Sequence, residues 1–414
     1  MQYVYDLVAA FTSLVHAPLP FITMILVLLF TARLFGELAE RIGVPSVVGE
    51  ITAGILLGPS ILNLVVASQR VMALADLGVF LLMMLAGMQY RLSEIRDAMK
   101  GRGMWSAVMA FAVPLAFGLG VGALGRLDAA RVCFLGLCLA ITALSVSLRT
   151  LIDLGKLHTP VGQHIVSAAV ISEIVAILLL GVVLDAKAEA SSWGALGPLV
   201  LRAVVKTLVL AGFVLLMFRS ARSVRSWVHT SMAKLKGPET IFAVAVMFVL
   251  LFAGASELMG LRFVIGAFFG AMLLNRDFLG PAIFSQVYQV AFGIAMGFLA
   301  PIFFVSIGLQ VDLTRLDRWG LLVAIVLAGL IGKILGGYLG GRLAGLSSAE
   351  SRVLGLGLNG RGMVEIIIAG VALENGFIGH QLFTMLVLMG VITTAVMPFL
   401  LKWGFRRLEF AKAA

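Results

Sequence analysis

The stretch GQHIVSAAVISEIVAILLLGVVLD, residues 162–185, contains the pattern on which the fold of this chain depends. It is long enough to cross the roughly 30 Å hydrocarbon layer of a membrane as a single helix. Glu173 lies about ten residues from either end, so at about 1.5 Å per residue it falls near the middle of the bilayer. An ionisable side chain at that depth costs a few kcal/mol and therefore needs a function or a partner.

The composition of the whole chain points the same way. Of the 414 residues, 61% are hydrophobic and 13% are charged, whereas a soluble domain is about half apolar and about a quarter charged. The net charge of +10 comes from Lys and Arg in short loops between apolar segments, and these residues form no basic face for nucleic acid. We therefore predict an all-α membrane protein solvated by the lipid bilayer, with no nucleic-acid partner.

About thirteen apolar segments are candidates for transmembrane helices. An N-terminus outside the cell places most Lys and Arg in cytoplasmic loops, as the positive-inside rule requires. We expect a multi-pass protein of the bacterial inner (plasma) membrane with a cytoplasmic C-terminus. The segments cover residues 19–40, 45–65, 71–90, 103–125, 130–152, 162–185, 195–218, 238–257, 261–275, 284–309, 318–343, 351–373 and 380–404.

Thirteen segments divide into two sets of six joined by one linker segment. Because the linker itself crosses the membrane once, the second set is inverted relative to the first. Six-helix inverted repeats are typical of secondary transporters, whose sites lie at the repeat interface. The fifth and twelfth segments correspond in the two sets, and small or polar residues interrupt both. Such interruptions predict discontinuous helices at the bilayer centre; the alternative is that Ser and Thr bond to their own helix and Gly allows close packing. The interrupting residues are Thr142, Ser145 and Ser147 in the fifth segment and Gly355, Gly357, Asn359, Gly360, Arg361 and Gly362 in the twelfth.

The carboxylate of Glu173 suggests a simple basis for ion exchange, because the same oxygens can hold a proton or a partly dehydrated alkali cation but not both. The alternative is a glutamate that serves only as a structural ion-pair partner. Lys333 is similarly central in the eleventh segment and is flanked by glycines, which permit close helix approach. A buried lysine needs a carboxylate or a set of carbonyls, so Glu173 or the end of a broken helix could be its partner.

Three other ionisable residues lie within apolar segments. Arg361 and Glu365 are four residues apart, so on a helix they could pair and stabilise the interrupted segment without touching an ion. Glu50 lies five residues after Pro45 near one end of the second segment. A role for Glu50 as a gate and a role in helix packing are equally compatible with this position.

The sequence predicts no cofactor and no enzymatic chemistry. Its five histidines are scattered near segment ends without metal-ligand spacing. It also contains no phosphate-binding glycine loop followed by lysine and serine or threonine, so we expect no use of ATP. The transported alkali cation is the one metal ion that we expect.

Four stretches resemble the monovalent cation:proton antiporter superfamily, in the branch of bacterial sodium/proton exchangers and Kef-type potassium/proton antiporters. They occur in the family's order over nearly the whole chain. The resemblance implies a homodimer in which each protomer has a dimerisation domain, residues 1–90 and 238–309, and a mobile core domain with two crossed, discontinuous helices, residues 103–185 and 318–414. Residues 195–218 would be the linker helix. The four stretches are PSVVGEITAGILLGP at 45–59, LGVFLLMMLAGMQ at 77–89, TALSVSLRTLIDL at 142–154 and NGRGMVE at 359–365.

The resemblance also implies roles for individual residues. The acidic residue of the family's sixth span falls on Glu173, and the basic residue of its eleventh span falls on Lys333, which would compensate charge. Family members with two adjacent carboxylates exchange two protons per cation, so Ser172 before Glu173 implies electroneutral, one-for-one exchange. Glu173, Ser172, Thr142 and Ser145 would then bind Na⁺ or K⁺ in alternation with H⁺, and the sequence leaves the choice between the two cations open.

Two other functions fit the same segments. Lys333 and Arg361 could create a positive centre for a carboxylate-bearing solute, which would make the protein an organic-anion symporter. A cation channel or a non-transporting sensor is the second alternative.

Overall fold

The computed structural model describes residues 20–66, 68–89, 103–157, 159–184, 212, 237–258 and 263–413. Within these ranges the ordered elements are all helices, and there is no β-strand. In chain order they are α2 (Phe21–Arg41), α3 (Ser46–Leu57), α4 (Gln69–Gln89), α6 (Gly103–Leu124), α7 (Ala129–Ala140), α8 (Leu144–Asp153), α9 (Pro160–Leu184), α11 (Pro238–Leu258), α12 (Phe263–Met272), α13 (Arg276–Leu279), α14 (Pro281–Ile294), the π-helix η3 (Ala295–Leu299), α15 (Ala300–Gln310), the 3₁₀-helix η4 (Leu313–Arg315), α16 (Trp319–Leu343), α17 (Ser348–Gly357), α18 (Met363–Glu374) and α19 (His380–Ala413).

The predicted class, an all-α membrane protein with several spans, is confirmed. Among the described residues, 7 helical segments are long and apolar enough to cross a membrane, and shorter apolar helices accompany them. The total of thirteen spans and the inverted repeats stay predictions, because the predicted linker span at 195–218 lies outside the described residues except for residue 212. The spanning segments are Phe21–Arg41, Gln69–Gln89, Gly103–Leu124, Pro238–Leu258, Pro281–Gln310, Trp319–Leu343 and His380–Phe410.

Two segments differ in detail from the prediction. The helix in the second segment ends at Leu57 instead of continuing to residue 65, because Gly58 is extended and the following Pro59 cannot donate a helical hydrogen bond. The tenth segment contains a five-residue π-helix between α14 and α15. Arg33 of α2 donates a hydrogen bond to the carbonyl of Met296 within this π-turn, and so satisfies part of its irregular backbone.

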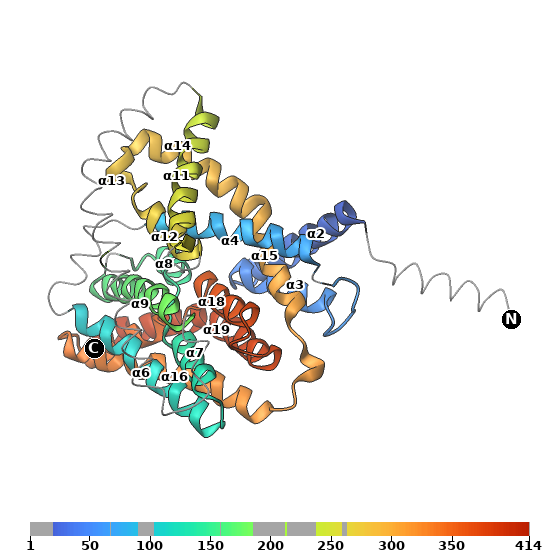
Figure 1. Ribbon diagram of the computed structural model, residues 1–414. Helices are drawn as coiled ribbons and strands as arrows, with labels where there is room; N and C mark the ends of the chain where they lie inside the picture. Colours follow the sequence, from blue (N-terminus) through green and yellow to red (C-terminus); the bar gives the residue numbers. More distant parts are fainter. Residues whose placement is uncertain are drawn as a thin grey trace.

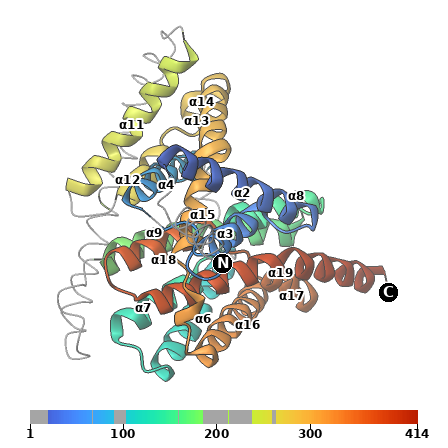
Figure 2. The same ribbon diagram turned by 90° about the vertical axis from the view of Figure 1, so that its right-hand side faces the viewer.

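The helices form two groups that lie side by side. In Figures 1 and 2, α11, α12 and α14 lie on one side of the molecule and α6, α7, α16 and α19 on the other. The first group contains α2 to α4 and α11 to α15, and the second contains α6 to α9 and α16 to α19, with the densest packing inside each group. The assignment of these groups as a dimerisation domain and a core domain remains a prediction from the family resemblance.

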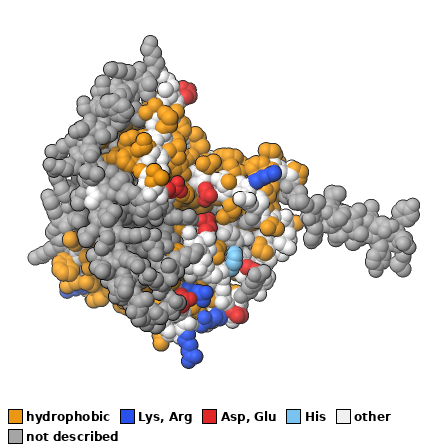
Figure 3. Space-filling model, viewed as in Figure 1, with side chains coloured by type: hydrophobic (Ala, Val, Ile, Leu, Met, Phe, Trp, Pro, Cys, Tyr) orange, Lys and Arg blue, Asp and Glu red, His pale blue; other side chains and the backbone are white. Residues whose placement is uncertain are grey.

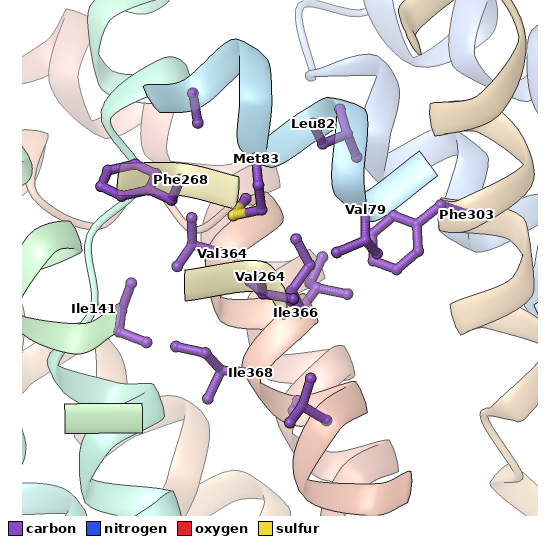
Figure 4. Close-up of a cluster of buried hydrophobic side chains, with 14 of the residues drawn as sticks. Val79, Leu82, Met83, Ile141, Val264, Phe268, Phe303, Val364, Ile366 and Ile368 are labelled. Atoms are coloured by element: carbon purple, nitrogen blue, oxygen red, sulfur yellow. The ribbon is translucent and has the colours of Figure 1, made fainter. Parts of the chain in front are cut away.

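The two groups meet through apolar side chains. Figure 4 shows Val79 of α4 and Val264 of α12 close to Ile366 of α18, and all three belong to one buried cluster. Much of the described outer surface is also hydrophobic, as Figure 3 shows over α2 and α11. An apolar outer surface is what a lipid solvent requires.

Glycines in α16 let two neighbouring helices approach it closely. One row, which includes Gly336 and Gly340, faces α6, and a second row, which includes Gly337, faces α17. A Cβ atom at Gly337 would overlap the backbone of Gly355 in α17. Lys333, between these rows, is fully buried, so the glycine spacing is what brings this lysine into the protein interior.

We expect Gly337→Ala to destabilise the protein by about 1–3 kcal/mol, because α16 and α17 must separate to admit the methyl group. The matched control is Gly320→Ala in the same helix, since a Cβ atom at Gly320 meets nothing within 4 Å. The midpoint of thermal unfolding of the purified protein in detergent measures both effects. An unchanged midpoint for Gly337→Ala would show that this helix contact is not tight.

Candidate functional site

Two interrupted helices face each other at the centre of the second helix group. α7 ends at Ala140 and α8 begins at Leu144, while α17 ends at Gly357 and α18 begins at Met363. The backbone N–H of Ala143 donates to the carbonyl of Gly360 at 2.9 Å, which joins one interruption to the other. The hydroxyl of Ser147 donates to the carbonyl of Gly357 at 3.0 Å. The predicted breaks in the fifth and twelfth segments are therefore present and in direct contact.

The two helix interruptions cover fewer residues than the polar and glycine residues of the sequence predicted. Ser145 and Ser147 lie in α8, and the side chain of Ser145 is outside the described part of the chain. Gly355 and Gly357 lie in α17, so the second break covers residues 358–362. Because Ser147 bonds across to the other interrupted helix, its hydroxyl links the helices without disrupting its own.

Arg361 lies in the second break and binds the end of α7. Its guanidinium donates to the carbonyls of Cys138 at 2.5 Å and of Leu139 and Ile141 at 2.9 Å each. Carbonyls at a helix C-terminus lack intrahelical donors and carry the negative end of the helix dipole. The guanidinium group of Arg361 therefore neutralises the buried C-terminal end of α7 at the point where the helix stops.

Arg361 is itself held in place by two contacts. Its Nη1 lies 3.5 Å from Oε2 of Glu365, and both side chains are almost completely buried. Its backbone N–H donates to the hydroxyl of Thr394 in α19 at 3.1 Å, and that hydroxyl donates back to the carbonyl of Arg361 at 2.9 Å. Arg361 thus pairs with Glu365 although it lies outside the helix that contains Glu365.

Lys333 also binds the end of α7. Its ammonium group donates to the carbonyl of Ala110 at 3.1 Å, to the carbonyl of Ala140, and to the hydroxyl of Thr142 at 2.7 Å. An ammonium group has three N–H donors, so these three acceptors use all of them. The sequence left two possible partners for Lys333, the carboxylate of Glu173 and the end of a broken helix. The described hydrogen bonds of Lys333 involve the end of a broken helix.

Glu173 lies in the middle of α9, which packs against both α7 and α8. Its side chain is 6% exposed. The neighbouring Ser172 is fully buried, and its hydroxyl oxygen has no hydrogen-bond partner among the described residues. A buried hydroxyl without a partner carries a free-energy cost. Coordination of a cation by the Ser172 oxygen, or a hydrogen bond from Ser172 to a water molecule, would remove that cost.

Two predicted site residues have other surroundings. Thr142 accepts a hydrogen bond from Lys333, and its own hydroxyl lies 3.4 Å from the carbonyl of Leu358. Glu50 lies between α2 and α3, where its Oε1 is 3.8 Å from a guanidinium nitrogen of Arg33. The pair formed by Glu50 and Arg33 belongs to the first helix group. The role of Glu50 as a gate stays a prediction, and so does the role of Thr142 as an ion ligand.

The sequence analysis did not predict that Thr394 forms hydrogen bonds with the backbone of Arg361. The polar pair Thr393 and Thr394 within an apolar segment was the available signal.

A cleft lies between the two helix groups and was also missed. It is lined by residues of α4, α12, α15 and α18 and contains about 410 Å³ of space not filled by protein, part of it open to solvent. Its polar lining residues are Asp76, Ser306, Gln310 and Glu374. These residues come from α4, α15 and α18, three distant parts of the sequence, so no local pattern marked them.

Comparison with known proteins identifies the group to which this arrangement belongs. Residues 25–407 match the family described as sodium/hydrogen exchanger, transmembrane. The chain is 30% identical over 389 residues to the Na(+)/H(+)-K(+) antiporter GerN of Bacillus cereus, covering 93% of this chain and 96% of GerN. It is 27% identical over 384 residues to a Na(+)/H(+) antiporter of Enterococcus hirae, covering 92% and 97% of the two chains.

A solved structure has the same fold. The sodium proton antiporter MjNhaP1 from Methanocaldococcus jannaschii aligns with a TM-score of 0.70 at 14% identity, covering 92% of this chain and 95% of that one. The family match spans almost the entire sequence, including both interrupted helices, Glu173 and Lys333. The chain is therefore a member of the sodium/hydrogen exchanger family, a family of cation/proton antiporters and so of transporters, not enzymes.

Proposed function

We propose that the protein exchanges Na⁺ or K⁺ for protons across the membrane, and that Glu173 alternately binds the cation and the proton. The observation that carries this proposal is a buried carboxylate halfway along α9, next in sequence to Ser172, whose hydroxyl has no hydrogen-bond partner among the described residues. Both lie on a helix packed against α7 and α8. The name of the relative from Bacillus cereus contains Na⁺, K⁺ and H⁺, and that of the relative from Enterococcus hirae contains Na⁺ and H⁺, which supports this choice of ions.

The cation shell that we propose consists first of Glu173 and Ser172, completed by water. In the state described here, Thr142 and the carbonyls at the end of α7 are occupied by Lys333 and Arg361. Thr142 would enter the shell if Lys333 released it. We therefore assign Lys333 and Arg361 to the stability of the broken helices, whose negative dipole end they neutralise.

The hydrogen bonds of Lys333 and Arg361 to the end of α7 also disfavour an organic-anion symporter. That function needs Lys333 and Arg361 to bind a solute carboxylate, but their hydrogen bonds to the end of α7 already use these positive groups. Binding an anion there would leave the helix carbonyls without donors, at about 1–3 kcal/mol for each buried group.

Transport further requires that the site open to each side in turn. We propose that the second helix group moves as a core domain against the first, as the family resemblance implies, and that the cleft beside Asp76 and Glu374 is the entrance on one side. The contact between the groups includes apolar side chains such as Val79 and Ile366. These side chains form no directional hydrogen bonds that a sliding movement would have to break.

We also propose that the protein is a homodimer in the bacterial inner membrane, with the N-terminus outside. The positive-inside pattern of the loops supports this orientation. The exposed apolar side chains of α2, such as Leu26 and Phe30, leave room for a partner subunit or for lipid.

We expect the exchange to be electroneutral, because the binding helix carries one carboxylate at this point and Lys333 has acceptors for all three ammonium protons. The test is recovery of a fluorescent pH signal in proteoliposomes to which Na⁺, K⁺ or Li⁺ is added, with and without a clamped membrane potential. The rate should not depend on the potential. Ser172→Asp, which places a second carboxylate beside Glu173, should make it depend on the potential; a potential-dependent rate in the unaltered protein would contradict one-for-one exchange.

A further inference from the structure

The last part of α19 extends past the length that a membrane span needs. α19 has 34 residues and is therefore about 51 Å long, whereas the hydrocarbon layer is roughly 30 Å thick. The helix continues through the basic residues Lys402, Arg406 and Arg407. Several turns of this helix therefore lie at, and beyond, the membrane–water boundary on the side of the C-terminus.

One face of this part of α19 packs against the protein. Leu401, Phe405 and Leu408 are buried in a cluster with Val353 and Leu354 of α17. These three positions repeat at intervals of four and three residues, so they lie on one side of the helix. The end of α19 is thus docked on α17 and has a defined outer face.

The outer face of this segment combines aromatic and basic side chains. Phe399, Trp403 and Phe410 are 54%, 51% and 75% exposed, and with Arg406, which is also exposed, they follow the helical repeat on the side opposite Leu401. The guanidinium of Arg407 lies over the ring of Trp403, 4.4 Å from its centroid. We define these five residues as the aromatic–basic stripe.

A water-exposed stripe of this kind is unfavourable unless something covers its rings. Aromatic side chains are enriched at the boundary between hydrocarbon and water, and arginines beside a membrane attract anionic headgroups. Glu409, the acidic residue nearest the stripe, is engaged in an ion pair with Lys156 of the loop between α8 and α9. That pair leaves the stripe itself with a net positive charge.

We propose that the aromatic–basic stripe binds anionic phospholipids of the leaflet on the C-terminal side. Phosphate groups would contact Arg406 and Arg407, and the rings of Phe399, Trp403 and Phe410 would lie among the upper acyl chains. Because α19 also supplies Thr394 to the broken helix α17–α18, lipid bound at its end is attached to the same helix that supports the candidate site.

The test uses the purified full-length protein in detergent, mixed with equal amounts of phosphatidylglycerol and phosphatidylcholine with identical acyl chains. Native mass spectrometry counts the lipids of each class that remain bound. The unaltered protein should retain phosphatidylglycerol preferentially, and Arg406→Gln/Arg407→Gln should lower that preference by about an order of magnitude or more. Arg406→Lys/Arg407→Lys should largely keep it, because the charge remains.

The matched control is Arg126→Gln/Arg131→Gln, which removes two exposed arginines next to the start of α7. This control should retain the preference for phosphatidylglycerol. The inference is overturned if the unaltered protein binds the two lipids equally, if Arg406→Gln/Arg407→Gln keeps the full preference, or if the control loses as much. Lipid counting does not require transport, so a failure here is distinct from a failure of the proposed function.

Discussion

Replacing Glu173 by glutamine should abolish cation-dependent proton flux in proteoliposomes. Glutamine keeps the size of the side chain and can still form hydrogen bonds, but it neither exchanges a proton nor supplies a negative charge for a desolvated cation. Because Glu173 is almost fully buried halfway along α9, the loss of its negative charge leaves a cation there without a compensating charge on that helix. The measurement is the recovery of a fluorescent pH signal after addition of Na⁺ or K⁺.

Two further variants make the result specific. Glu239→Gln removes an acidic side chain from the first turn of α11 and should leave the flux unchanged. Glu173→Asp keeps the carboxylate and should retain measurable exchange, with altered cation affinity because the oxygens move back by one methylene. Exchange by a correctly folded Glu173→Gln protein would reject Glu173 as the ion- and proton-binding group.

The position of Glu173 along its helix could be predicted from the sequence, since it depends on properties that run along a single segment. The apolar segment around Glu173 predicted a helix with this residue near its middle, and Glu173 lies near the middle of α9. The polar residue Thr142 and the glycines near Asn359 likewise marked where two helices stop. These are local signals, and the structure places both breaks within the predicted stretches.

The partners of the basic residues could not be predicted in the same way. Lys333 and Arg361 bind carbonyl groups of α7, and every residue has a carbonyl, so no side-chain pattern identifies the acceptors. The sequence indicated that Lys333 needed a partner and left a carboxylate and a helix end as alternatives. The choice between them depends on how α16 packs against α6 and α7.

The sequence contained a signal for the end of α3 but none for the π-helix η3. Gly58 and Pro59 were available as a stop signal for α3, but the apolar residues that follow outweighed it in the predicted span. The residues of the π-turn, AMGFL, are compatible with an ordinary helix. Its irregular backbone is stabilised by a contact from Arg33, more than 250 residues earlier in the chain, and sequence periodicity does not report such distant contacts.

Replacing Arg361 by methionine should destabilise the protein more than any exposed charge removal. Methionine fills a similar volume but leaves the carbonyls of Cys138, Leu139 and Ile141 without the guanidinium that they share. It also leaves Glu365 without its ion-pair partner in the interior. Breaking a buried ion pair from one side costs about 3–5 kcal/mol, which should appear as a large decrease in the midpoint of thermal unfolding in detergent. Arg276→Met, at an exposed position in α13, is the control and should have little effect.

A double variant separates the two contributions. Adding Glu365→Gln to Arg361→Met removes the uncompensated buried charge but not the unsatisfied carbonyls, so the double variant should recover part of the lost stability. Arg361→Lys should fall in between, because one ammonium group cannot reach three carbonyls in the fork geometry of arginine. If Arg361→Met unfolds at the same temperature as the unaltered protein, α7 does not depend on this residue for its termination. In that case the two broken helices must be held together by other contacts between them, such as those of Thr142, Ala143 and Ser147.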